Sequence, residues 1–194
     1  MSTIGARRRV PQNNLHQAQS SFARCRIQCE YFRAEAWCVM TSSVYIETSV
    51  VSYLTATPTR DVAILAHQQI TREWWATRSR FELFVSQAVF DEASAGDPGA
   101  AARRLGSLQG ITVLEVTPAA LAMAKGLVQS GVLPPKALVD SIHVATAAVH
   151  GIDYLLTWNC KHIANAAIRG RIERSCRALG LQPPLICTPE ELVE

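Results

Sequence analysis

Four oxygen-bearing side chains stand where strands are expected to end or where helices are expected to follow them: Glu47, Glu92, Asp140 and Asn159. Glu47 and Asn159 each come just after a short apolar segment. Asp140 lies on a predicted helix that is otherwise apolar, where an ionised carboxylate is costly unless it is paired or bound to a metal. Asp140 is therefore the most informative of the four.

Oxygen ligands of this kind suit Mg²⁺ or Mn²⁺, which are hard cations that keep several waters and bridge to phosphate oxygens. Three carboxylates crowded together repel one another, and a divalent cation offsets that repulsion. A cation so placed can lower the pKa of a water molecule, orient it for attack on phosphorus and stabilise the leaving oxygen. The pattern predicts metal-assisted phosphodiester hydrolysis, which needs no histidine, cysteine or serine nucleophile.

Taken singly, each residue also has an ordinary structural explanation. Glu47 could mark a strand end that runs into a capped helix. Glu92 could lie on a solvated helix face. Asp140 could pair with Lys136, one helical turn earlier, and Asn159 could be a turn residue. Taken together, the four oxygen-bearing side chains favour a single cleft in which they all lie.

The elements that must position these residues alternate along the chain. Apolar segments predict strands over 44–46, 81–86, 112–116, 153–157 and 185–188. Helical spacing predicts helices over 48–54, 59–78, 87–95, 100–108, 118–130, 136–150 and 169–179. Strands joined by helices imply a mostly parallel sheet covered on both faces. Ligands bind such sheets at the carboxyl ends of the strands, where Glu47 and Asn159 are expected.

The composition suits one globular domain with an extra segment. The chain has 194 residues, of which 48% are hydrophobic and 18% charged, and no apolar run long enough to span a membrane. The net charge of +3 is concentrated in residues 1–39, which hold six arginines and two glutamates. Residues 40–194 therefore hold 13 basic and 14 acidic residues and carry a net charge of −1. A polyanion partner must be held by local basic patches or by metal ions.

The basic leader over 1–39 has two explanations. It could be a disordered basic arm that docks on a partner or on nucleic acid, or an overlong gene prediction whose true start is Met40. The domain proper is expected over 40–194. The six cysteines form no disulfide or zinc framework, and the first 25 residues hold no signal-peptide core. We therefore expect a cytoplasmic protein.

Four segments together resemble a known family: Tyr45-Ile46-Glu47-Thr48-Ser49, Val85-Ser86-Gln87 with Glu92, the helix around Asp140, and Thr157-Trp158-Asn159. They are similar to PIN-domain proteins of the VapC-like toxin kind, ribonucleases of type II toxin–antitoxin systems. The resemblance spans essentially all of residues 43–190.

This resemblance implies a three-layer α/β/α sandwich with a mostly parallel, roughly five-stranded sheet. It implies an endoribonuclease that uses Mg²⁺ or Mn²⁺, is silenced by a small antitoxin and forms a homodimer. The positions of the metal-binding acids fall on Glu47, Glu92 and Asp140, and Asn159 stands where a further acid is frequent. Ser49 and Thr157 match supporting hydroxyls.

Two departures from the family's pattern bear on activity. Glu47 stands where such proteins usually have Asp, and Asn159 is neutral, so the cluster has at most three formal charges. Weaker metal affinity or slower turnover should follow, and the alternative is a catalytically inactive PIN-fold protein that binds or regulates. Beyond Asn159, Lys161 and His162 could contact RNA phosphates or belong to a solvated loop.

Other folds with acids at strand ends fit less well. A phosphoacceptor receiver needs an acidic pair at the first strand, and a haloacid-type phosphatase needs an Asp-x-Asp-x-Thr motif; the segment around Glu47 has neither. No G-x-G-x-x-G motif for dinucleotide binding is present.

Overall fold

The computed structural model describes residues 41–193. The leader expected over 1–39 lies outside the described residues, and its two explanations stay predictions. Five parallel strands form one sheet in the order β3-β2-β1-β4-β5. Their bounds are β1 Ser43–Ile46, β2 Glu82–Ser86, β3 Thr112–Leu114, β4 Tyr154–Leu156 and β5 Leu185–Cys187.

Helices connect each strand to the next. The α-helices are α1 Thr48–Thr55, α2 Val62–Ala76, α3 Gln87–Ala93, α4 Pro98–Ser107, α5 Pro118–Gln129, α6 Leu138–Val149 and α7 Ala166–Ala178. Short 3₁₀ turns occupy η2 Arg78–Arg80, η3 Pro135–Ala137 and η4 Pro189–Leu192. None of the helices within residues 41–193 is long and apolar enough to cross a membrane.

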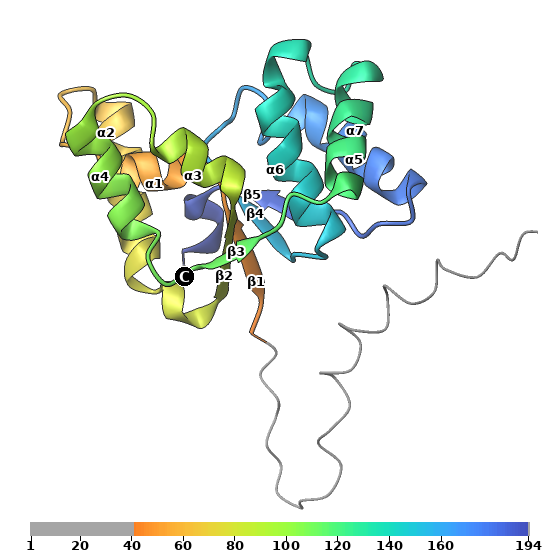
Figure 1. The fold of residues 1–194 in the computed structure, drawn as a ribbon. Helices are drawn as coiled ribbons and strands as arrows, with labels where there is room; N and C mark the ends of the chain where they lie inside the picture. Colours follow the sequence, from red (N-terminus) through yellow and green to blue (C-terminus); the bar gives the residue numbers. More distant parts are fainter. Residues whose placement is uncertain (1–40, 194) are drawn as a thin grey trace, which may run out of the picture. The chain divides into compact units, whose positions relative to one another are not determined.

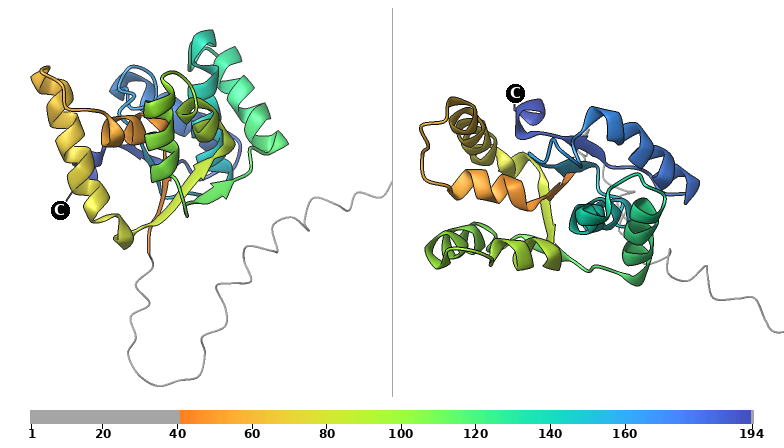
Figure 2. Two further views of the ribbon diagram at one scale, coloured as in Figure 1. Left: turned by 60° about the vertical axis from the view of Figure 1, so that its left-hand side comes forward. Right: turned by 90° about the horizontal axis from the view of Figure 1, so that it is seen from above.

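The sheet lies between two groups of helices. Figure 1 shows α1 to α4 on one side of the strands and α5, α6 and α7 on the other. The view from above in Figure 2 separates the same two groups. The expected three-layer α/β/α sandwich with a five-stranded parallel sheet is therefore confirmed.

Strand β1 is the centre of the core. Val44, Tyr45 and Ile46 are fully buried because β1 has a strand on each side and helices over both faces. The ladder continues past β1, where the amide of Glu47 donates to the carbonyl of Leu156 at 3.0 Å. This bond brings the carboxyl ends of β1 and β4 to the same edge of the sheet.

The element boundaries follow the predictions closely, with two informative differences. The helix expected over 136–150 starts as the 3₁₀ turn η3, and α6 proper begins at Leu138. The helix expected from 169 begins at Ala166, because the Asn165 side chain accepts a hydrogen bond from the amide of Ala167 at 2.9 Å. An Asn at the N-cap starts a helix before its apolar periodicity becomes visible in the sequence.

Candidate active site

Glu47 lies at the junction of β1 and α1 and is 95% buried. It occupies the N-cap position of α1, yet its side chain makes no hydrogen bond to the helix amides. Its Oε2 instead accepts hydrogen bonds from the hydroxyls of Ser49 and Thr157, the latter at 2.6 Å. The carboxylate is thus held between a hydroxyl of the first turn of α1 and a hydroxyl just after β4.

The second carboxylate of the site, Glu92, is carried by α3. Its Oε2 accepts a hydrogen bond from Thr48 Oγ1 at 2.5 Å and lies 2.9 Å from His143 Nε2. Its neighbour Asp91 is exposed and accepts a hydrogen bond from Gln87 Nε2 at 2.8 Å. Of the two adjacent acids, Glu92 is the one that faces the other site residues.

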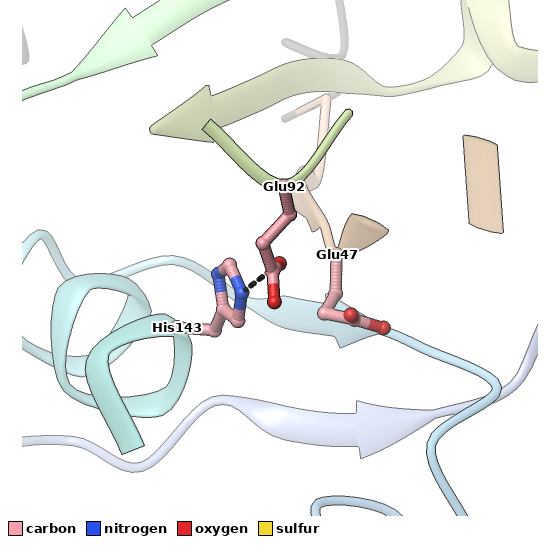
Figure 3. A group of neighbouring side chains, drawn as sticks. All are labelled: Glu47, Glu92 and His143. Atoms are coloured by element: carbon pink, nitrogen blue, oxygen red, sulfur yellow. Dashed lines mark hydrogen bonds and ion pairs between the residues drawn. The ribbon is translucent and has the colours of Figure 1, made fainter. Parts of the chain in front are cut away.

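His143 completes a group of three side chains from three different elements. It lies on α6, is fully buried, and its Nδ1 is 2.8 Å from the hydroxyl of Tyr45, which in turn is 2.6 Å from Ser86 Oγ. Ligand atoms of Glu47, Glu92 and His143 all lie within 4.8 Å of one another, a spacing that one metal ion could bridge. Figure 3 shows the three side chains as neighbours, with His143 paired to Glu92 and Glu47 beside them.

The charges of this group shift its pKa values. Burial by itself would lower the pKa of His143, but the hydrogen bond to Glu92 and the negative charges of Glu47, Glu92 and Asp140 outweigh burial and raise it. Burial by itself would raise the pKa of Glu92, but the hydrogen bonds and charge of His143 and the Thr48 hydroxyl lower it. Burial also raises the pKa of Tyr45 far above its ordinary value, so its hydroxyl stays protonated.

Asp140 belongs to a second, adjoining group. Its Oδ1 accepts a hydrogen bond from Asn159 Nδ2 at 2.9 Å, and its Oδ2 lies 2.7 Å from His162 Nδ1. The side-chain oxygen Oδ1 of Asn159 accepts a hydrogen bond from the backbone amide of His162 at 3.1 Å. Asp140 therefore binds the loop after β4, and this pairing takes the place of the alternative pairing with Lys136.

The predicted supporting residues lie where the two groups meet. Ser49 Oγ accepts a hydrogen bond from the backbone amide of Trp158 at 2.8 Å, and Thr157 Oγ1 accepts one from the amide of Asn159 at 2.9 Å. Thr157 and Ser49 thus connect the carboxylate of Glu47 to the loop that carries Asn159. Of the two predicted RNA contacts, Lys161 is exposed and His162 is half-buried.

One carboxylate oxygen on each glutamate of the first group has no partner among residues 41–193. Glu47 and Glu92 each receive both of their hydrogen bonds on Oε2, which leaves each Oε1 without one. Both oxygens of Asp140 are engaged. The two glutamates are therefore fixed in place and still have a ligand atom to offer.

His143 is the site residue that the sequence reasoning missed. It lies three positions after Asp140, on the same turn of a helix that is apolar apart from a few small polar residues. A buried imidazole one turn from a predicted ligand was the available signal. Because only oxygen ligands were expected for Mg²⁺ or Mn²⁺, this imidazole was not among the predicted ligands.

Comparison with known proteins identifies the fold. No protein-family model and no curated protein matches the chain. Among solved structures, it is similar to VapBC2 from Rickettsia felis bound to a DNA fragment from the promoter, with a TM-score of 0.50 and 12% sequence identity. That match covers 75% of this chain and 97% of the other. The chain has the PIN-domain fold of VapC proteins.

Two further structures with this PIN-domain fold also match. A toxin–antitoxin complex from Klebsiella pneumoniae has a TM-score of 0.48 and 17% identity, and the match covers 76% of this chain and 98% of the other. VapC20 from Mycobacterium tuberculosis, a toxin that cleaves the sarcin-ricin loop, has a TM-score of 0.47 and 17% identity over 64% of this chain and 95% of its own.

Proposed function

We propose that this PIN domain is a metal-dependent endoribonuclease and the toxin of a toxin–antitoxin pair. The observation that carries the proposal is the convergence of Glu47 and Glu92 at the carboxyl edge of the sheet, each with one oxygen held and one free. Two carboxylates this close repel each other, and a divalent cation between them removes the repulsion. The donor set suits Mg²⁺ or Mn²⁺.

The protein's own residues would prepare this site before any cation arrives. The hydroxyls of Ser49, Thr157 and Thr48 hold the two glutamates, so little side-chain freedom is lost when a ligand binds. Helix α6 supplies the third metal-binding position, which the family resemblance assigns to Asp140. A bound cation would activate water and offset charge on the phosphate.

Substrate contact is proposed for the loop after β4. Asn159 holds Asp140 through its amide; Lys161, which follows, is exposed, and His162 is half-buried beside Asp140. A local positive charge is needed there because residues 40–194 carry a net charge of −1 and attract no polyanion as a whole. Lys161 and His162 would then contact RNA phosphates.

The partners are proposed from the same fold. VapBC2 from Rickettsia felis is a complex, and by analogy we expect a small antitoxin to bind this chain in the cytoplasm and the chain to form a homodimer. The second candidate function is a PIN-fold protein that binds RNA or a partner without cutting. The neutral Asn159, whose amide is used to hold Asp140, is the observation that favours it.

Cleavage of a panel of RNAs by the full chain tests the proposal. We expect cleavage with Mg²⁺ or Mn²⁺ and none with a chelator. The cleavage rate should fall by about 100-fold or more in Glu47→Gln, Glu92→Gln and Asp140→Asn, since even residues that only hold a metal ligand contribute about 10–100-fold to metal affinity or activity. Glu82→Gln, at an exposed site on β2, is the matched control and should cut normally. Equal cleavage by all the proteins would indicate contamination, and RNA binding without cleavage would establish the second candidate.

A further inference from the structure

We propose that His143, and not Asp140, is the third protein ligand of the cation, and that the site consequently prefers Mn²⁺ to Mg²⁺. This inference rests on the proposed metal-dependent function and goes beyond it in naming the ligand and the ion. It replaces an all-oxygen site by one with two carboxylates and an imidazole.

The first argument is distance. Candidate ligand atoms of Glu47, Glu92 and His143 lie within 4.8 Å of one another, and Asp140 is not a member of that group. The side chain of His143 comes from α6 toward Glu92, and its Nε2 is the ring nitrogen that faces the Glu92 carboxylate (Figure 3). One cation between these atoms could bind all three residues.

The second argument is how the imidazole is anchored. His143 is fully buried and its Nδ1 is 2.8 Å from the Tyr45 hydroxyl, which is itself 2.6 Å from the buried Ser86. Histidines that bind metals almost always have the second ring nitrogen held by such a partner, which fixes the ring and the tautomer. In the metal-free protein Nε2 shares a proton with Glu92 Oε2 at 2.9 Å, and a bound cation would take the place of that proton while Nδ1 donates to Tyr45.

The third argument is that both carboxylate oxygens of Asp140 already have hydrogen-bond partners. Asn159 and His162 bind one oxygen each, so coordination by Asp140 would break or share at least one of these contacts. The Oε1 atoms of Glu47 and Glu92 need no such exchange, and at His143 Nε2 the cation would replace only the proton shared with Glu92, which is itself a proposed ligand. Asp140 acts instead as a positioning residue that holds the loop after β4 against α6.

The choice of ion follows from the imidazole. Mg²⁺ strongly prefers oxygen ligands, whereas an imidazole nitrogen is a good ligand for transition metals, and the affinity of a mixed site rises from Mn²⁺ along the first row. We expect the full chain to bind Mn²⁺ at least about tenfold more tightly than Mg²⁺. Substitution of His143 should reduce this difference in affinity between the two ions.

Pulsed electron paramagnetic resonance on the Mn²⁺-loaded full chain tests the proposal, because a coordinated ¹⁴N nucleus modulates the Mn²⁺ signal. We expect a nitrogen coupling in the wild-type protein that changes to the ¹⁵N pattern when only the histidines carry ¹⁵N. It should disappear in His143→Gln and persist in the matched variants His162→Gln and Asp140→Asn. Tyr45→Phe should keep the coupling but bind Mn²⁺ about 10–100-fold more weakly, as expected for an outer partner.

The outcomes separate this inference from the proposed function. Mn²⁺ bound without histidine nitrogen coupling, or with a coupling that only His162→Gln removes, would overturn the inference even if RNA is cleaved. Histidine coupling in a protein that cleaves no RNA would support the ligand assignment and contradict the proposed activity. No Mn²⁺ binding at all would overturn both. If His143→Gln fails to fold, the histidine coupling of the labelled wild type together with its persistence in His162→Gln supports the assignment, and its loss in His162→Gln overturns it.

Discussion

At the scale of single residues, the site is built from carboxylates that are each held by one oxygen. Glu47 is one methylene longer than the Asp that the family resemblance implies at this position, and the structure shows how that length is accommodated: its Oε2 lies against Thr157, the residue that follows the neighbouring strand β4. The sequence indicated Ser49 and Thr157 as supports, and both donate to Glu47.

The His143–Glu92 pair predicts how the stability of the metal-free protein depends on pH. The pKa of Glu92 is lowered below its ordinary value of 4.5, so its contribution is present above that value and is lost as the pH falls through its folded pKa. The pKa of His143 is raised above 6.5, so its contribution is present below 6.5 and is lost as the pH rises through its folded pKa. The pair therefore stabilises most between these two ordinary values.

Urea unfolding in the presence of a chelator, across a pH series that spans both values, measures this effect. The difference in unfolding free energy between the wild-type protein and Glu92→Gln should be largest inside the window and shrink on both sides. Glu82→Gln, an exposed substitution, should parallel the wild type. A difference in unfolding free energy that does not change with pH would show that Glu92 and His143 do not stabilise each other's charged forms.

At the scale of elements, the sequence predicted nearly every strand and helix because the strands are short and mainly apolar and the helices end at clear stop signals. Helix α6 is an example: its C-cap is His150, and the next residue is Gly151 with a φ of 67°. The grouping of side chains was harder to predict. Asp140 and His143 share one face of α6, yet they pair with different elements, and only the packing of α3 and the loop after β4 decides which.

Two glycine substitutions test the roles of these helices in stability. Gly151→Ala should destabilise the protein by about 1–2 kcal/mol, because an L-residue is strained at this positive φ. Gly126→Ala, inside α5, should stabilise it by about 0.5–1 kcal/mol, since an added Cβ meets no atom within 4 Å and alanine favours the helix. Thermal unfolding of the two variants checks the opposite signs, and a shift in the same direction for both would contradict this account.

At the scale of the whole molecule, the site depends on the entire sheet. Glu47 follows the central strand, Thr157 follows β4, and the amide of Thr157 donates to the carbonyl of Cys187 on β5 at 3.0 Å. Binding of a cation should therefore stabilise the whole fold, because the unfolded chain cannot gather these ligands.

This linkage predicts a thermal shift. At a free Mn²⁺ concentration of about 100 times Kd, the stabilisation is about 2.7 kcal/mol, which corresponds to a rise in Tm of roughly 5–10 °C for a domain of this size. Differential scanning fluorimetry with and without chelator measures it. Glu47→Gln and Glu92→Gln should lose the shift and Glu82→Gln should keep it; an equal shift in all variants would indicate Mn²⁺ binding elsewhere.

The separation of Glu47 from Thr157 in the chain, 110 residues, has a consequence for synthesis. A ribosome that has made only the first half of the protein has released Glu47 but none of β4, so the carboxylate has no hydroxyl from that strand and no loop to close on it. With the proposed ribonuclease activity, the active site would assemble only after Thr157 has left the ribosome, so the ribosome that makes the chain would not meet a complete centre before that point.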